Sequence, residues 1–188
     1  FKEGDELLRA MPKDQPFFAY VQTAGNHRPF TIPALNDGFE VKHPTLAEVQ
    51  AAGSRSVEQY NAVRLLDFNL GRLMEIAKAG GWYENTIFVM FGDHNTRIAQ
   101  IPFLAPAYEQ LGLESNAVPM IIHAPGLIGT RQVKEAVGLV DLLPTVAGMA
   151  GLEFRNSGMG RDIQQPAPEG ERVVPLVLRE GTFPLIAG

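Results

Sequence analysis

The sequence that decides the fold runs from Tyr60 to Asn95 and reads YNAVRLLDFNLGRLMEIAKAGGWYENTIFVMFGDHN. Apolar residues recur at helical spacing in its first half, which predicts a helix over residues 54–78. The run TIFVMF at residues 86–91 is rich in β-branched and aromatic residues, which predicts a buried strand that ends at Gly92. A long helix that leads into a short, continuous apolar strand is typical of an α/β protein.

The rest of the chain alternates the same two kinds of segment. Apolar runs and helical patterns predict strands over residues 16–23, 118–122 and 173–178 and helices over residues 103–111 and 139–150. Residues 31–53 and 156–172 contain many Gly and Pro residues and are expected to form a long surface connection and a loop. Continuous apolar strands separated by helices predict a three-layer sandwich, in which helices cover both faces of a mainly parallel sheet.

Length and composition limit the class of protein. The 188 residues are 45% hydrophobic and 20% charged, which fits a single globular domain over residues 1–188, with a peripheral tail over residues 164–188. The net charge of −5 provides no excess of basic residues, so a nucleic-acid partner is disfavoured. The absence of cysteine excludes disulfides, thiolate metal sites and a cysteine nucleophile. No apolar run is long enough to span a membrane.

Polar residues follow three of the predicted strands at the point where each strand ends. Asn26-His27-Arg28 follows the first strand, Asp93-His94 follows the second, and His123 follows the third. Ligands bind beyond the carboxyl ends of the strands in open α/β sheets, so these residues are the candidates for a functional site. In a mainly parallel sheet we expect all three histidines to lie on the same edge.

Asp93 and His94 form the sharpest pair in the sequence. A carboxylate next to an imidazole provides oxygen and nitrogen donors that suit zinc, manganese and similar divalent ions. Gly92 would let the backbone leave the strand at an unusual angle, so that both side chains could turn inward. Two neighbouring residues cannot complete a metal site, so further ligands must come from elsewhere. The alternative is that Asp93 caps the following segment and His94 is a surface loop residue.

The Asn26-His27-Arg28 stretch combines an amide, an imidazole and a guanidinium. Together they could bind an anionic ester, with His27 donating a hydrogen bond or carrying a proton and Arg28 making a two-pronged contact with its oxygens. The alternative is a simple turn before Pro29, with Arg28 in solvent. His123 lies between apolar neighbours and is interpreted as structural, and Asp141 is interpreted as a cap of the helix over residues 139–150.

Five stretches, in order, resemble the sulfatase branch of the alkaline phosphatase superfamily. Besides residues 60–95 they are FFAYVQTAGNHRPF at 17–30, VPMIIHAPG at 118–126, VDLLPTVAGMAG at 140–151 and GMGRDI at 158–163. The Asn26-His27-x-Pro29-Phe30 form is most similar to the lipoteichoic acid synthase-like phosphoglycerol transferases. The resemblance implies an alkaline phosphatase-like α/β fold that is incomplete at its N-terminus.

The resemblance also implies roles for single residues. Asp93 and His94 match the ligands of a catalytic divalent ion, manganese first, with magnesium, zinc or calcium as alternatives. His27 matches a histidine near the substrate phosphate. The family's nucleophile, a threonine or a modified cysteine or serine, has no match here. The chain is therefore expected to be a C-terminal portion of a catalytic domain, inactive alone and prone to self-association through an exposed sheet edge.

Three functions follow as hypotheses. The first is a metal-dependent phosphoryl-transfer enzyme, such as a phosphoglycerol transferase, that acts on lipid-linked or glycan-linked phosphate esters through a covalent intermediate. The second is a sulfuric ester hydrolase. The third is a non-catalytic binding module that retains the fold. By resemblance, the site would lie outside the cytoplasm, in a domain of a membrane protein. A chance placement of histidines on the loops of an α/β domain is the remaining alternative.

Overall fold

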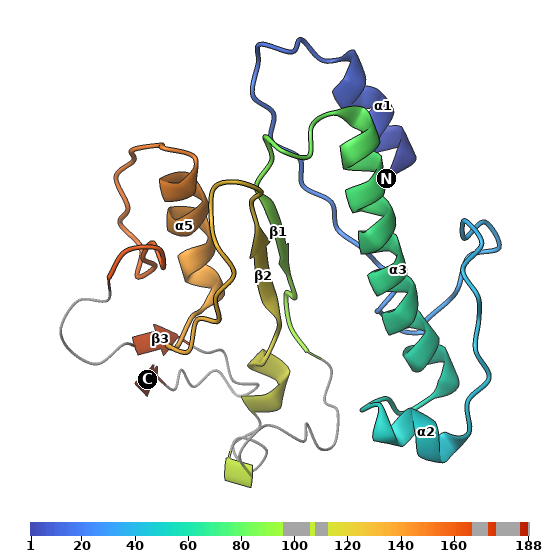
Figure 1. Cartoon of the computed structure of the whole chain (residues 1–188). Coiled ribbons are helices and arrows are strands. Elements are labelled where there is room, and N and C mark those ends of the chain that lie inside the picture. Colours follow the sequence, from blue (N-terminus) through green and yellow to red (C-terminus); the bar gives the residue numbers. More distant parts are fainter. Residues whose placement is uncertain (96–105, 108–112, 167–172, 176–184, 188) are drawn as a thin grey trace. The chain divides into compact units, whose positions relative to one another are not determined.

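The computed structural model describes residues 1–95, 106–107, 113–166, 173–175 and 185–187. The described residues divide into two compact units, which we call unit 1, from Phe1 to Thr86, and unit 2, from Ile87 onward. Unit 1 contains helices α1, α2 and α3, and unit 2 contains strands β1 to β4, two short 3₁₀ helices and helix α5 (Figure 1). Among the described residues no helix is long and apolar enough to cross a membrane.

Helix α3, Val57–Gly80, confirms the helix predicted for residues 54–78. The Ser56 side chain caps its first turn by accepting a hydrogen bond from the backbone amide of Gln59. The helix ends at Gly81, whose left-handed backbone (φ 75°) is the conformation that glycine adopts without steric cost. Its buried side chains include Ala62, Leu65 and Ala77.

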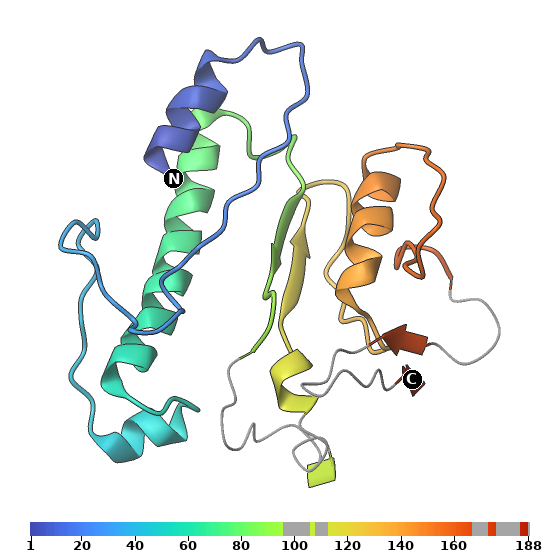
Figure 2. The same ribbon diagram turned by 180° about the vertical axis from the view of Figure 1, so that it is seen from behind.

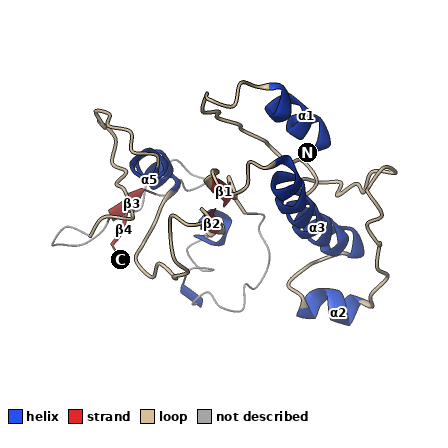
Figure 3. Cartoon of the chain, turned by 45° about the horizontal axis from the view of Figure 1, so that its top comes forward, coloured by secondary structure: helices blue, strands red, loops and turns tan. Residues whose placement is uncertain are grey.

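Two helices that the sequence analysis missed pack against α3. Helix α1, Lys2–Ala10, and helix α2, Leu46–Ala51, contact the two ends of α3 (Figure 3). The Asp5 carboxylate of α1 accepts a hydrogen bond from the Trp82 indole at 2.8 Å. Helix α2 interrupts the surface connection expected over residues 31–53, and a capping box between Thr45 and Glu48 begins it.

The strand predicted for residues 16–23 is wrong within the described part of the chain. These residues are extended but pair with no strand, and Phe18 is 89% exposed. A strand needs neighbours for its backbone hydrogen bonds, and the described residues of unit 1 contain no other strand. Phe17 alone of its immediate neighbours is half-buried, with its ring edge-on to Trp82 at 6.1 Å. Composition was therefore insufficient to predict a strand here.

The two strands predicted for residues 86–91 and 118–122 are confirmed, but they run in opposite directions. Strand β1, Phe88–Phe91, pairs antiparallel with β2, Met120–His123, and the two lie side by side (Figures 1 and 2). Strand β3, Val173–Pro175, also pairs antiparallel, with β4, Leu185–Ala187. Both described sheets are thus antiparallel. The sequence did not predict this, because a continuous apolar run indicates that a strand is buried but does not indicate its direction. The parallel three-layer sandwich stays a prediction.

Helix α5, Leu142–Met149, follows the 3₁₀ turn η2, Leu139–Asp141, and together they confirm the helix predicted for residues 139–150. Asp141 is fully buried, and its carboxylate accepts hydrogen bonds from the amides of Gly138 at 2.9 Å and Arg161 at 2.8 Å. These bonds hold the predicted loop beyond residue 156 against the start of α5.

Three further expectations fall partly or wholly on undescribed residues. The helix predicted for residues 103–111 lies outside the described residues except for the helical pair at 106–107. The strand predicted for residues 173–178 is confirmed over residues 173–175, and its remainder lies outside them. The structure describes the predicted loop over residues 156–172 up to residue 166, where no helix or strand is assigned.

Candidate functional site

The segment after β1, Gly92–Asn95, which we call the β1 exit, is held by backbone contacts on both sides of Asp93-His94. The amide of Gly92 donates to the carbonyl of Pro119 at 3.2 Å, which continues the β1–β2 ladder by one bond. Asn95 donates from its backbone to Ser115 at 2.7 Å and from its side chain to Ala117 at 3.0 Å. The two residues between these anchors are therefore fixed by partners that lie 20 or more positions away from Gly92 and Asn95 in the sequence.

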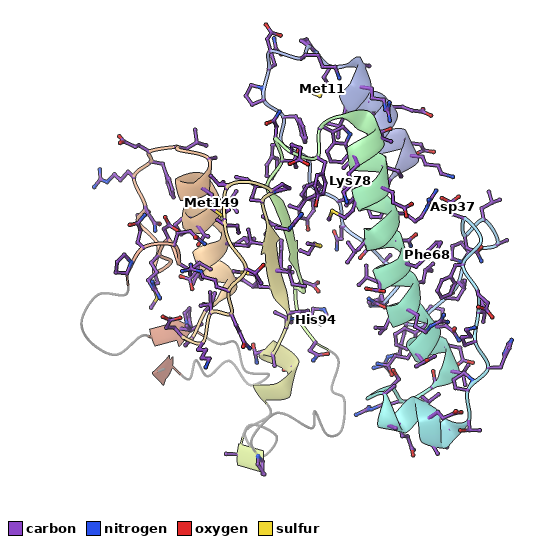
Figure 4. The ribbon with its side chains drawn as sticks, in the orientation of Figure 1. Met11, Asp37, Phe68, Lys78, His94 and Met149 are labelled. Atoms are coloured by element: carbon purple, nitrogen blue, oxygen red, sulfur yellow. The ribbon has the colours of Figure 1, made fainter. Side chains whose placement is uncertain are left out.

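The Asp93 and His94 side chains extend into solvent from this fixed backbone. Their exposed fractions are 75% and 67%, and His94 lies just beyond the end of β1 (Figure 4). Asp93 uses Oδ1 to accept the backbone amide of His94 at 2.9 Å, while Oδ2 lies 3.6 Å from Nε2 of His94. The bond to the His94 amide occupies one oxygen of Asp93, and the other oxygen faces the His94 ring, so a ligand could bind between Oδ2 and Nε2.

The donor set suits a divalent ion in kind and is incomplete in number. One carboxylate oxygen and one imidazole nitrogen are ligands that manganese and zinc accept. Among the described residues no further histidine or acidic side chain lies close enough to form a three-ligand group with Asp93 and His94. A metal bound at the β1 exit would take its remaining ligands from outside this group.

Gly92 serves the β1 exit through its size. The sequence analysis attributed it to an unusual backbone angle, but Gly92 is not among the glycines with positive φ. A Cβ atom at this position would lie 3.0 Å from Cβ of Val118, closer than side chains normally approach. Gly92 is therefore needed for the close approach of two chain segments at the end of β1, and not for a special backbone conformation.

The second predicted set lies in a turn of unit 1, residues 24–30, which we call the His27 turn. The His27 amide donates to the carbonyl of Ala24, and the Phe30 amide donates to the carbonyl of His27, both at 3.0 Å. The ring atom Nδ1 of His27 lies 2.8 Å from the carbonyl of Arg28. Because a carbonyl only accepts, this hydrogen bond assigns the proton to Nδ1 and leaves Nε2 without a partner among the described residues.

The two neighbours of His27 present different atoms. The Arg28 side chain is exposed and forms no hydrogen bond or ion pair within the described chain, so its guanidinium is available to an anion. Oδ1 of Asn26 is buried and has no hydrogen-bond partner in this part of the structure. An anion would therefore have to bind the amide nitrogen of Asn26, and the roles predicted for all three residues stay predictions.

The expectation that His123 shares an edge with Asp93-His94 is wrong. His123 pairs with Phe88 at the start of β1, whereas Asp93 follows the end of β1. Antiparallel strands have their carboxyl ends at opposite ends of the pair, so the two exits are separated by the length of the strand. The His123 ring lies 6.0 Å from that of Phe88, in agreement with the structural role.

Sequence reasoning also missed a cavity of about 360 Å³ in unit 1. It begins at Pro29 and Phe30, directly after Arg28, and reaches Glu58 in the first turn of α3. His43, which the sequence analysis left without a role, lies in its wall. No local pattern marks this cavity in the sequence, because its wall joins residues 29–32, 41–43 and 57–61, which tertiary packing brings together.

Comparison with known proteins gives a consistent family. The sequence model of the sulfatase family matches residues 1–152. Lipoteichoic acid synthase 2 of Bacillus subtilis (strain 168) is 29% identical over 192 residues, with 97% of this chain and 27% of the relative covered. The lipoteichoic acid synthase-like protein YvgJ of the same strain is 30% identical over 192 residues, with 97% and 29% covered. The chain thus spans less than a third of the length of these relatives.

A solved structure supports the fold. The crystal structure of the lipoteichoic acid synthase LtaP from Listeria monocytogenes matches with a TM-score of 0.57 and 23% sequence identity, covering 80% of this chain and 37% of that one. This likeness shows that this chain shares the fold of part of the LtaP chain. Since the family model extends over most of the chain, we conclude that this protein belongs to the sulfatase family.

Proposed function

We propose that this chain is part of a metal-dependent phosphoryl-transfer enzyme of the phosphoglycerol transferase type. The observation that carries the proposal is the β1 exit, where Oδ2 of Asp93 and Nε2 of His94 lie 3.6 Å apart and exposed on a backbone fixed by Gly92 and Asn95. The anchors on both sides fix the backbone of these two exposed residues, which is the preorganisation that a ligand site needs. The names of the similar proteins, lipoteichoic acid synthases, support the same reaction class.

Asp93 and His94 would hold the ion, and manganese is the first candidate. When bound, a divalent ion at such a site polarises an ester oxygen and lowers the pKa of a hydroxyl nucleophile. The Oδ1 bond to the His94 amide orients the Asp93 carboxylate before any ligand arrives, which lowers the entropic cost of binding. The Nδ1 atom of His94 lies 3.4 Å from the Asn95 carbonyl, which favours Nε2 as the ligand atom.

His27 and Arg28 would bind the anionic group of the ester. Nδ1 of His27 donates to the Arg28 carbonyl, so neutral His27 can only accept a proton at Nε2, and protonated His27 can donate from it. The same ring can therefore take a proton from an attacking alcohol or give one to a departing oxygen. Arg28 adds a guanidinium that matches the spacing of two phosphate oxygens.

The reaction would proceed through a covalent phospho-enzyme. A hydroxyl nucleophile, which we assign to no residue of this chain, attacks phosphorus and the alcohol leaves; water or an acceptor alcohol then displaces the enzyme oxygen. We favour a phosphate ester over a sulfate ester because of the Asn26-His27-x-Pro29-Phe30 stretch. Lipid-linked or glycan-linked esters outside the cytoplasm are the substrates that the similar proteins suggest.

The test uses the protein as its gene encodes it, with manganese and two substrates, an aryl phosphodiester and an aryl sulfate. We expect turnover of the phosphodiester that a chelator abolishes, and a loss of at least about 100-fold in Asp93→Asn and in His94→Ala. The matched control is Asp67→Asn, which changes an exposed carboxylate on α3 and should keep full activity.

The outcomes separate the alternatives. Turnover of the sulfate alone would replace the phosphoryl-transfer proposal with a sulfatase. Activity that survives both Asp93→Asn and His94→Ala would overturn the metal assignment. No turnover of either substrate, with manganese bound at the β1 exit, would favour a binding module.

A further inference from the structure

The cavity of unit 1 lies directly beside the His27 turn. It measures about 360 Å³ and is open to solvent, with Thr31, His43 and Glu58 exposed along its wall. Pro29 and Phe30 form part of its wall and follow Arg28 in the chain, so the cavity and the proposed anion-binding residues belong to one continuous segment. A ligand held at the His27 turn would have its remaining atoms near this opening.

The wall is mainly apolar. It includes the side chains of five apolar residues, Pro29, Phe30, Ile32, Val41 and Val57. Asn61 also lines it, but its amide group is fully engaged: it accepts the Lys42 amide at 2.9 Å and donates to the carbonyls of Lys42 and Val57. Asn61 therefore builds the wall and is not available to a ligand.

Three polar side chains of the wall remain available. Thr31 and His43 make no hydrogen bond within the described chain, and Glu58 lies in the first turn of α3. A hydrogen bond from the Ser56 hydroxyl lowers the pKa of Glu58 below its ordinary value, so Glu58 is a carboxylate near neutral pH. The remaining lone pairs of Glu58 can accept further hydrogen bonds.

The charge of the wall indicates which part of a phosphate ester, the anionic phosphate group or the neutral alcohol part, could bind in the cavity. A carboxylate repels a phosphate group, whereas it accepts hydrogen bonds from hydroxyl groups. The nearby lysine and arginine of the wall segments are engaged: Lys42 is paired with Glu40, and Arg64 donates to the Glu40 carbonyl and to Asn61. Arg28 lies outside the lining residues, in the His27 turn. The cavity therefore disfavours an anion and suits a neutral ligand that has carbon faces and hydroxyl edges.

We propose that this cavity binds the neutral polyol part of the substrate while the His27 turn binds its anionic group. The carbon chain or ring of the polyol would lie against Phe30 and Ile32, and its hydroxyls would bond to Glu58 and His43. This inference rests on the proposed function for the choice of ester. The binding of a neutral polyol can nevertheless be measured without metal or turnover, so the two proposals can fail separately.

The test is an NMR titration of the chain without metal, using glycerol, methyl glucoside and inorganic phosphate as probes. We expect saturable shifts of the backbone amides of Thr31, His43 and Val57 with at least one neutral polyol. Glu58→Gln should weaken that binding at least about fivefold, because the acceptor loses its charge. Glu84→Gln, an exposed residue of unit 1 outside the cavity, is the matched control and should leave the affinity unchanged.

Ile32→Trp places a larger side chain in the cavity and should abolish the shifts. If Ile32→Trp does not fold, Glu58→Gln still tests the proposal. The proposal is overturned if neither polyol shifts these amides saturably, if Glu58→Gln binds as well as the unchanged chain, or if phosphate shifts the same amides more strongly than the polyols. Loss of the proposed enzymatic function with polyol binding intact would leave the cavity assignment in place.

Discussion

Two apolar segments of similar composition are each followed by a glycine and a histidine, but only one of them forms a paired strand. TIFVMF at residues 86–91 contains β1, which pairs with β2 and leads into the anchored β1 exit. PFFAYVQT at residues 16–23 is unpaired in the described chain and exposed except for Phe17, and it leads into a turn held by local bonds. The comparison teaches that a candidate site is positioned by the long-range partners of its strand, and not by the strand's own sequence.

The largest expected effect contrasts two phenylalanines, one from each segment. Phe88→Ala removes a buried ring of β1 and should lower the free energy of unfolding by about 3–5 kcal/mol. Phe18→Ala removes a ring that is exposed to solvent and should change it by less than about 0.5 kcal/mol. Urea unfolding followed by circular dichroism measures both. Equal losses would show that residues 16–23 are packed, contrary to this structure.

The next effect contrasts the glycines before the two motifs. Gly92→Ala places Cβ 3.0 Å from Val118 Cβ and should cost about 1–3 kcal/mol, because the ends of β1 and β2 must separate. Gly25→Ala meets no atom within 4 Å, so it should be neutral or stabilise by up to about 1 kcal/mol. The measurement is the same urea titration. A destabilising Gly25→Ala with a neutral Gly92→Ala would reverse the comparison.

A smaller effect contrasts two asparagines. Asn95→Ala removes the side-chain bond to the Ala117 carbonyl and should cost about 1 kcal/mol. Asn26→Ala removes a buried oxygen that has no partner among the described residues, so it should be close to neutral. Hydrogen exchange at residues 92–95 gives a second readout: it should accelerate in Asn95→Ala and stay unchanged in Asn26→Ala.

The smallest effect concerns the contact between α1 and Trp82, which follows the end of α3 and also packs against Phe17. The hydrogen bond from Trp82 holds the pKa of Asp5 below its ordinary value, and Arg9 contributes to this shift. A lowered folded-state pKa means that the stabilisation is present above the unfolded pKa and is lost as the pH falls through the folded pKa. Trp82 fluorescence should therefore report a loosening in acid that Asp5→Asn does not show. An identical acid transition in both proteins would contradict the role of Asp5.

Local signals in the sequence predicted local structure well. Ser56 and Gly81 mark the ends of α3, and the glycine and proline content beyond residue 156 predicted a loop. Asp141 was predicted as a cap, but its bond to the Arg161 amide joins positions 20 residues apart and has no local signal. The direction of β2 was missed for the same reason, because strand pairing depends on distant residues.

In the candidate site, too, the features with a local sequence signal were predicted and those that depend on distant residues were not. Asp93, His94 and His27 were recognised from their position after apolar runs and from the family resemblance. The anchors of the β1 exit at Ser115 and Ala117, and the cavity wall shared by Phe30 and Glu58, depend on tertiary packing. No periodicity in the sequence predicts such contacts.

The central claim, that Asp93 and His94 bind a divalent ion, is tested most directly by paramagnetic broadening. Substoichiometric manganese is added to the chain, and backbone amide signals are followed by NMR. We expect the amides of Gly92, Asp93, His94 and Asn95 to broaden first, and the combined Asp93→Asn and His94→Ala variant to lose this selectivity. Broadening that begins at other acidic groups, such as Asp37 or Glu48, or that persists at residues 92–95 in the double variant, would contradict the account.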